Sequence, residues 1–205
     1  TVGALPPARA ANNVASTYDA DNRILAATGA TFTHDTNGNL TAIGGTKPTA
    51  FAYDYFNRLT QVAFTNYSAS YRYDARGSRI SKTVNGIATR FIVDLRPRLS
   101  QVLAETDNAG NASAYYVHGL GLISKITPSG QTYFYHSDRI GSTVALTDSA
   151  GNNVNKYAYD PFGNLSGNSS GAIPNPFRYV GRFGVMDEDN GLLHMRARYY
   201  LPRMG

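Results

Sequence analysis

A short motif that recurs at intervals of about twenty residues constrains this chain more than any other feature of its sequence. Residues 18–24 read Tyr-Asp-Ala-Asp-Asn-Arg-Ile, and residues 53–59 read Tyr-Asp-Tyr-Phe-Asn-Arg-Leu. A third copy at 73–80 reads as one residue longer, a weaker copy begins at His34, and a late copy occupies 159–165. The residues assigned to this structural repeat motif are Tyr18, Asp19, Tyr53, Asp54, Tyr73, Asp74, Tyr159, Asp160 and Gly163.

Each copy has the composition of a turn between two strands. Tyrosine suits the end of a strand, and the aspartate after it can accept a backbone N–H two residues later and so open a turn. Asparagine or glycine then supplies a residue in the left-handed region. Alternating stretches follow, such as 59–64 and 80–84, with the period of two expected of strands that bury one face. Twenty residues therefore predict one two-stranded hairpin.

A single hairpin is marginally stable in water, so copies of the unit are expected to pack side by side. The chain holds 15 Tyr and 20 Gly, which suits many short strands joined by tight turns. We predict an all-β fold in which the hairpins lie side by side, with the recurring tyrosine rings stacked between neighbours. The repeated Tyr-Asp pair is therefore interpreted as structural.

Residues 1–90 carry the regular repeats, and residues 91–205 form a second region in which the period is irregular. Strand-like stretches and turns continue through that region, including a hairpin turn at 128–130. The segment 166–176 is rich in Gly, Ser, Asn and Pro and predicts a surface loop. No segment has a convincing helical period, and residues 188–198 could form one short turn at most.

Composition argues against several classes of function. The net charge of +5 comes mainly from arginine, but acidic residues lie among the C-terminal arginines, so we expect no nucleic-acid site. The absence of cysteine excludes disulfides and thiolate metal sites. No apolar run is long enough to span a membrane, and the N-terminus lacks the pattern of a signal peptide. Because the sequence starts without Met, it is expected to be part of a longer chain.

The second region contains six further motifs in a definite order. They are YHSDRIGS at 135–142, ALTD at 145–148, YDPFGN at 159–164, FRYVG at 177–181, DNGLL at 189–193 and RARYY at 196–200. With the Tyr-Asp repeats, they resemble the YD or RHS repeat and, in the second half, the RHS-associated core, over nearly the whole chain. The residues assigned to the core motif are His136, Asp138, Gly141, Arg178, Gly181, Gly191, Arg198, Tyr199 and Tyr200.

The resemblance implies a β-sheet that spirals into a hollow shell, as in polymorphic toxins, insecticidal toxin complexes and teneurins. For the bacterial members it implies that the shell encloses a C-terminal toxin. It also implies that the core plugs one end and cleaves itself through acidic residues around Asp-Pro motifs. This chain has Leu201-Pro202 where members often carry Asp-Pro, and it ends before the usual cleavage motif. We therefore expect a core truncated at its C-terminus, with no catalytic residue and no enzymatic activity.

Isolated polar clusters favour structural roles over catalytic ones. His136-Ser-Asp138 has no further ligand or nucleophile at a recognisable spacing, so a hydrogen bond at a strand end is the favoured interpretation. The stretch 35–39 resembles a calcium loop only faintly, because its glycine falls fourth rather than sixth. Residues 187–189 precede Asn-Gly and predict a hairpin turn. We expect no metal site and no cofactor.

Three functions are compatible with these residues. The first is a structural shell segment of a large secreted or cell-surface bacterial protein that encapsulates or delivers a C-terminal toxin, with the rest of the shell and the toxin as partners. The second is an extracellular fibre or adhesive element that self-assembles or contacts carbohydrate or protein. The third is an aspartate-dependent self-cleaving core, with Asp160, Asp187, Glu188 and Asp189 as the acidic candidates. The repeat and core motifs favour the first.

Overall fold

The structure is a computed structural model that describes residues 16–27 and 29–204. Within these residues the 3-10 helices are η1 (Gly181–Phe183) and η2 (Pro202–Met204). The strands are β1 (Thr17–Tyr18), β2 (Ile24–Ala27), β3 (Ala30–His34), β4 (Leu40–Ile43), β5 (Thr49–Tyr53), β6 (Leu59–Phe64), β7 (Tyr67–Tyr73), β8 (Arg79–Val84), β9 (Ile87–Asp94), β10 (Gln101–Thr106), β11 (Ala112–Gly119), β12 (Gly121–Ile126), β13 (Thr132–Ser137), β14 (Thr143–Thr147), β15 (Asn153–Lys156), β16 (Ser170–Gly171), β17 (Met186–Asp187), β18 (Leu193–Met195) and β19 (Arg198–Tyr200).

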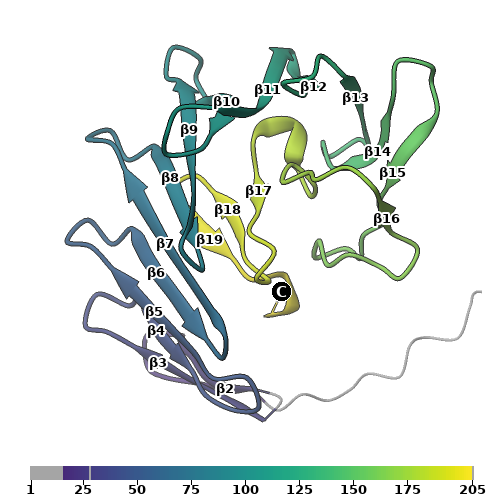
Figure 1. Cartoon of the computed structure of the whole chain (residues 1–205). Coiled ribbons are helices and arrows are strands. Elements are labelled where there is room, and N and C mark those ends of the chain that lie inside the picture. The colour runs from purple at the N-terminus through teal and green to yellow at the C-terminus, as the bar shows by residue number, and fades with distance from the viewer. Residues whose placement is uncertain (1–15, 28, 205) are drawn as a thin grey trace, which may run out of the picture.

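Strands β1 to β16 form one antiparallel sheet in which the order in space is the order in the chain. Figure 1 shows this sheet curving around a concave face, with the three-stranded sheet β17–β18–β19 on the inside of the curve. The prediction of an all-β fold built from hairpins placed side by side is confirmed. In the described part of the chain, neither helix is long and apolar enough to cross a membrane.

The loop at Asp54 shows how the motif makes a hairpin. The Asp54 carboxylate accepts the backbone N–H groups of Phe56 at 2.9 Å and Arg58 at 3.0 Å. Asn57 takes a φ of 59°, a left-handed conformation that asparagine tolerates. The backbone N–H of Asp54 then donates to the carbonyl of Arg58 and closes the loop. The N–H of Asn57 also donates to the carbonyl of Asp54, so the loop is a four-residue turn that ends in a left-handed residue, as in a common hairpin connection.

The same loop closes many of the other hairpins, with the N–H of its first residue donating to the carbonyl of its fifth. Its further copies are Asp19–Arg23, Asp35–Asn39, Asp74–Ser78, Asp107–Asn111, Thr127–Gln131, Asp138–Ser142, Asp148–Asn152 and Asp160–Asn164. The loop geometry thus continues beyond residue 91, where the sequence period is irregular. The distance in sequence between successive loops shortens in this region, because the loops at 138–142 and 148–152 lie at opposite ends of one strand, β14.

The third copy of the motif is not one residue longer, and that part of the sequence interpretation is wrong. Tyr73 pairs with Arg79 in the register in which Tyr53 pairs with Leu59. Ser78 closes the loop in the third copy, so Arg79 occupies the inward-facing position that Leu59 occupies in the preceding copy. An arginine therefore stands in an apolar position of the repeat.

The motif tyrosines do not stack on one another as predicted. Within the described residues, the aromatic contacts do not join motif tyrosines of successive repeats. Instead, the hydroxyls of Tyr53, Tyr73 and Tyr159 each reach a carbonyl of an earlier strand, which fixes the ring against that strand. These bonds run from Tyr53 to Leu40 at 3.0 Å, from Tyr73 to Leu59 at 2.6 Å and from Tyr159 to Thr143 at 2.7 Å. Tyr18, in edge strand β1, is exposed.

Alternation along the strands buries one face of the sheet. In β7, Ala69 and Tyr71 are buried, whereas Ser70 and Arg72 between and after them are exposed. The buried side chains form three clusters, one of which joins the sheet to the C-terminal segment through Leu192. The core therefore lies between the concave face of the sheet and the chain's own C-terminal segment.

One expectation for the C-terminal region needs correction. Residues 188–198, where one short helical turn at most was expected, contain β18 and lead into β19, and Leu192 is buried against the large sheet. The segment 166–176 is a surface loop only in part. It contains strand β16, and Asn175 is buried with its amide bonded to the backbone of Phe177.

Candidate functional site

A cluster of buried polar side chains lies where β8 meets the segment after β17. Nη1 of Arg79 is 2.5 Å from Oε1 of Glu188, and both side chains are 1% exposed. Nζ of Lys82 lies 3.5 Å from the other carboxylate oxygen of Glu188. The ion pair therefore ties the large sheet to the C-terminal segment inside the core.

Arg79 reaches this position because it replaces a leucine or isoleucine of the repeat on the concave face. Its guanidinium lies 5.4 Å from the ring centroid of Tyr71 and 5.1 Å from that of Phe91. A cation over aromatic faces gains electrostatic attraction in a dry environment. Nη2 lies 3.3 Å from Sδ of Met186 in β17. Side chains of the neighbouring strands β7, β9 and β17 thus surround the buried positive charge of Arg79 and stabilise it.

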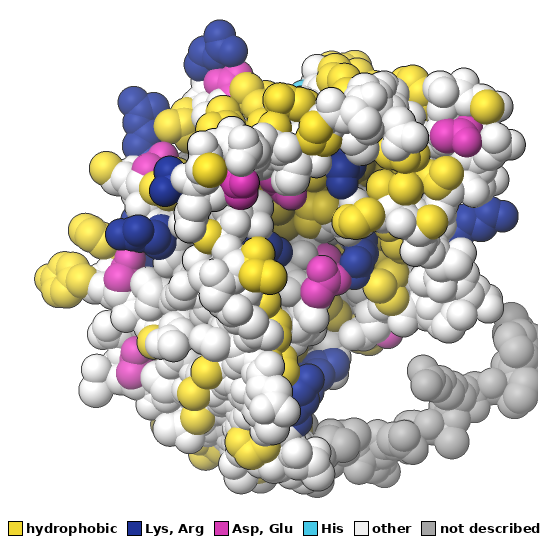
Figure 2. Space-filling model, viewed as in Figure 1, with side chains coloured by type: hydrophobic (Ala, Val, Ile, Leu, Met, Phe, Trp, Pro, Cys, Tyr) yellow, Lys and Arg dark blue, Asp and Glu magenta, His cyan; other side chains and the backbone are white. Residues whose placement is uncertain are grey.

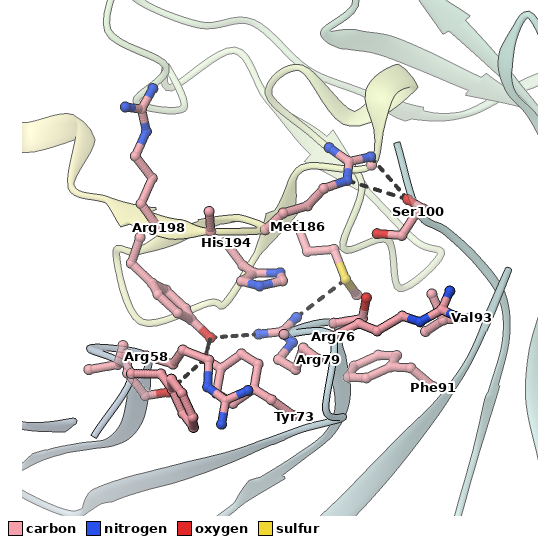
Figure 3. Close-up of a pocket in the computed structure, with 18 of the residues that line it drawn as sticks. Arg58, Tyr73, Arg76, Arg79, Phe91, Val93, Ser100, Met186, His194 and Arg198 are labelled. Carbon is pink, nitrogen blue, oxygen red and sulfur yellow. Dashed lines mark hydrogen bonds between the residues drawn. The ribbon is translucent and has the colours of Figure 1, made fainter. Parts of the chain in front are cut away.

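Tyr199 of the predicted core motif joins the same cluster. Its hydroxyl lies 3.2 Å from the hydroxyl of Tyr73 and accepts a hydrogen bond of 3.2 Å from Arg79. Figure 3 shows Tyr73, Arg79 and His194 around this network, with the side chain of Arg198 running away from Arg79. The structure therefore brings Tyr73 of the repeat motif together with Tyr199 of the core motif.

Burial and the ion pair set the charge states in this cluster. Although burial works against the charge of Arg79, the Glu188 carboxylate raises the pKa of Arg79. Burial raises the pKa of Tyr199, so its hydroxyl stays protonated. Burial and then the charge of Arg79 lower the pKa of His194 well below its usual value. The cluster thus holds one charged pair beside neutral Tyr and His side chains.

A cavity of about 840 Å³ opens beside the cluster. Its walls come from the loops at residues 56–58 and 76–79, from β9, and from the segment 194–199. His194 and Arg79 line it, and Figure 3 shows both side chains in the interior beside Tyr73 and Phe91. The cavity was not foreseen, because the residues around it are far apart in the sequence.

The acidic residues considered for self-cleavage do not form one site. Asp187 and Asp189 both contact Nη1 of Arg178, at 3.2 and 2.8 Å. Burial raises the pKa of Asp187 above its ordinary value. Asp160 lies in a repeat loop, bonded to Asn164, and Glu188 is paired with Arg79. The arrangement at Arg178 is that of two carboxylates bridged by a cation.

His136 and Asp138 have separate partners. Nε2 of His136 lies 2.9 Å from Oγ1 of Thr147 on the neighbouring strand. The Asp138 carboxylate accepts the backbone N–H groups of Ile140 and Ser142, as in the other repeat loops. In the described part of the chain, no three His, Cys, Asp or Glu side chains are grouped so that they could hold a metal ion.

The predicted glycines allow the C-terminal segment to pack closely on the repeat loops. A Cβ at Gly141 would lie 2.6 Å from the Phe183 ring, and one at Gly163 would lie 2.7 Å from the Tyr179 ring. A Cβ at Gly181 would lie 3.0 Å from that of Phe177. Gly191 has a φ of 92° in the turn between β17 and β18. Tyr200 donates to the carbonyl of Phe162 at 3.0 Å.

Sequence reasoning did not bring Arg79, Glu188 and His194 together, and it considered Glu188 only as an acidic candidate for self-cleavage. The signal for Arg79 was present, because it is an arginine in a position where other copies carry leucine or isoleucine. Glu188 lies between two aspartates and looks like part of a solvated turn, and His194 lies in an apolar stretch without a motif.

Figure 2 shows the basic and acidic side chains interspersed over the face in view, as expected from the sequence.

Comparison with known protein families gives one clear match. The sequence model of the family described as Teneurin YD-shell matches residues 8–205. Among curated proteins, the tRNA3(Ser)-specific nuclease WapA of Bacillus spizizenii is 34% identical over 195 residues, and the tRNA nuclease WapA of Bacillus subtilis is 35% identical over 195 residues. Each alignment covers 94% of this chain and 8% of the relative's length.

Solved structures share the fold at lower identity. A Photorhabdus luminescens Tc holotoxin pore with a mutant TccC3 protein matches 93% of this chain and 13% of its own, with a TM-score of 0.57 and 16% identity. The crystal structure of TcdB2-TccC3-Cdc42 matches 91% of this chain and 14% of its own, with a TM-score of 0.54 and 17% identity. At these identities the likeness concerns the fold.

Proposed function

The chain belongs to the Teneurin YD-shell family, and we propose that it is part of the wall of a hollow β-shell that encloses a toxic polypeptide for delivery. The shell-forming role follows from the fold and the family. The enclosed cargo, its delivery and a secreted or cell-surface location in bacteria are our proposal. The other proposed partner is the rest of the same shell.

The observation that carries the proposal is the way the sheet is built. Sixteen strands follow one another in chain order, so the wall can be extended at both ends by adding repeats. Among the described strands, β1 and β16 lie at the two edges of the sheet. Open edges invite further strands, and a continuing wall would cover them. This geometry suits a segment of a wall.

The second support is what fills the concave face. Leu192 and Tyr199 of the C-terminal segment pack on β6 and β7, and Glu188 is buried against β8. A fibre that used its tyrosine rows for outside contacts would leave these rings exposed, whereas Tyr53 and Tyr73 are half-buried and donate to carbonyls within the sheet. The inward-facing tyrosines therefore favour a wall with an interior over an adhesive surface.

The names and lengths of the curated relatives support a separation between a shell and a toxic part of the same protein. They are named as tRNA nucleases, and this chain spans 8% of their length. We propose that the chain corresponds to the housing and that any nuclease or other toxic activity belongs to a different part of the parent protein. In this proposal the chain itself has no enzymatic role, and the carboxylates held by Arg178 serve structure.

The proposal is tested by cryo-electron microscopy of the natural parent protein purified from its source. We expect a closed β-wall in which the sheet continues past β1 and β16, with additional polypeptide density inside. Filaments of stacked copies, or an open sheet without an interior, would contradict it and favour the fibre. Mass spectrometry of the same sample determines whether the interior polypeptide is a separate chain.

A further inference from the structure

The cavity of about 840 Å³ beside the buried ion pair is lined by charges of one sign. Its described lining contains no Asp or Glu and six arginines, namely Arg58, Arg76, Arg79, Arg98, Arg196 and Arg198. Two of them, Arg58 and Arg79, have carboxylate partners. The other four form no ion pair within residues 16–27 and 29–204. Guanidinium groups gathered around one space repel one another, and an anion in that space relieves the repulsion.

This chain has no acidic side chain left to neutralise these four arginines. All 14 of its Asp and Glu residues lie in the described part of the chain, and none of them lines the cavity. Many of them hold the repeat loops by accepting backbone N–H groups. Others pair with arginines elsewhere, as Asp94 does with Arg96. A carboxylate side chain that pairs with the cavity arginines must therefore come from outside these 205 residues.

The arginines without a carboxylate partner come from three elements around the cavity. Arg76 lies in the loop between β7 and β8, Arg98 lies between β9 and β10, and Arg196 and Arg198 lie at the start of β19 and just before it. Figure 3 shows Arg76 on the large sheet and Arg198 on the C-terminal segment. Arg76, Arg98 and Arg198 are exposed, so a ligand that enters from solvent can reach them. Arg196 is half-buried and donates to backbone carbonyls.

The rest of the described lining is mixed, which favours a peptide over a small inorganic anion. Ser78 and Ser100 contribute hydroxyl groups, which can donate and accept hydrogen bonds, beside apolar side chains such as Leu40 and Val93. A volume of about 840 Å³ lies within the range of sites that hold organic ligands, so it has room for several residues of peptide. A peptide offers carboxylates to the arginines and backbone N–H groups to the hydroxyls, whereas a phosphate ion has no such array of donors.

We propose that this cavity binds an extended polypeptide segment that carries several Asp or Glu side chains, with Arg76, Arg98 and Arg198 pairing with its carboxylates. The choice of partner rests on charge complementarity, because an arginine fork binds a carboxylate through two parallel hydrogen bonds. The three arginines lie on different elements, so successive acidic residues of one segment can each pair with one of them. The inference goes beyond the shell-forming role, which by itself needs no ligand.

The test is a calorimetric titration of the 205-residue chain at an ionic strength of about 0.05 M, where exposed charges are weakly screened. Four probes are used. They are an end-blocked hexapeptide in which three glutamates alternate with alanines, its counterpart with glutamine in place of glutamate, citrate and inorganic tripolyphosphate. We expect saturable binding of the glutamate peptide at one site per chain, and no binding of the glutamine peptide at the same concentrations.

A triple variant locates the binding in the cavity. Arg76→Gln, Arg98→Gln and Arg198→Gln together remove three exposed cations from the lining. The variant is expected to bind the glutamate peptide about tenfold more weakly, since each exposed ion pair contributes modestly. Because all three side chains are exposed, circular dichroism should show the variant to be folded.

The matched control combines Arg72→Gln, Arg90→Gln and Arg139→Gln, which change the net charge equally at exposed positions outside the lining. Its affinity for the glutamate peptide should stay within about twofold of that of the unchanged chain. The proposal is overturned if the control weakens binding as much as the cavity variant, if the glutamine peptide binds equally well, or if the glutamate peptide does not bind saturably. Tighter binding of citrate or tripolyphosphate than of the glutamate peptide also overturns it, because the cavity would then select a small anion.

Discussion

Arg79 and Glu188 are 109 positions apart in the sequence, and their side chains meet at 2.5 Å with 1% of each exposed to solvent. Arg79 is the first residue of β8, and Glu188 lies in the turn directly after β17. The pair thus connects the wall to the segment that fills its concave face. A charge buried this deeply is tolerated only while its partner is present.

Removing one member of this pair is expected to be costly. Glu188→Ala leaves the Arg79 guanidinium buried without a carboxylate, so the free energy of unfolding should fall by about 3–5 kcal/mol. Urea denaturation followed by far-ultraviolet circular dichroism measures it. The control is Asp94→Ala, which breaks the pair with Arg96, a side chain 89% exposed, and should have a much smaller effect. Equal losses would mean that the Arg79–Glu188 pair is not buried in solution.

The repeat loops depend on their first residue. Asp54→Ala removes the acceptor of two backbone N–H groups, so we expect a loss of about 1–2 kcal/mol in the free energy of unfolding. Asp54→Asn keeps a side-chain oxygen and should lose less. The same denaturation experiment ranks the two variants. Equal losses in the two variants would show that charge, rather than the two hydrogen bonds, is what the loop requires.

Gly163 tests the packing of the C-terminal segment on a repeat loop. Both Gly163 and Gly151 have a left-handed φ, of 96° and 85°, so alanine is strained at either position. Only at Gly163 would the new Cβ meet another side chain, the Tyr179 ring at 2.7 Å. We therefore expect Gly163→Ala to cost about 1–3 kcal/mol more than Gly151→Ala. Equal thermal stabilities of the two variants would show that Tyr179 does not pack there.

His194 gives the chain a distinctive dependence on pH. Its pKa in the folded chain lies below 6.5, so the unfolded chain binds a proton more readily as the pH falls through 6.5. The contribution of His194 to the free energy of unfolding is therefore complete above about pH 6.5 and decreases as the pH falls below that value. His194 faces Arg79 and Lys82 on β8 and Arg196 after β18, whose charges act in the same direction as burial.

Denaturation of the chain and of His194→Phe between pH 7.5 and 4.5 tests this dependence, and the variant should lose much of the slope. Below pH 3.8 a second loss follows in both proteins. Hydrogen bonds from asparagines and backbone N–H groups lower the pKa of loop aspartates such as Asp107 and Asp148. Asp187, whose pKa burial raises, acts in the opposite direction in both. Identical slopes above pH 4.5 would contradict the burial of His194.

The fold followed from the sequence to the extent that it rests on local chemistry. The aspartate loops, the left-handed Asn or Gly and the alternating strands all lie within about twenty residues, and each predicted a hairpin. The sheet order followed because each hairpin pairs with the next one in the chain. The stacking of tyrosines was predicted wrongly, because the sequence does not show where a hydroxyl finds its carbonyl.

The candidate site could not be predicted in the same way. Glu188 lies in a run of three acidic residues that suggests solvent exposure, but Asp189 is exposed whereas Glu188 is buried. That difference arises only when residues 186–200 fold back onto a face formed more than a hundred positions earlier. The informative local sign was Arg79, a charged residue in the apolar position of the repeat.

Amide hydrogen exchange of this chain tests most directly whether the C-terminal segment fills the concave face of the wall. We predict that peptides covering residues 186–200 are protected as strongly as those covering β7 and β8, and that Glu188→Ala raises exchange in both regions together. Rapid exchange of residues 186–200 while β7 and β8 remain protected would contradict the account, because the wall would then be folded without the segment inside it.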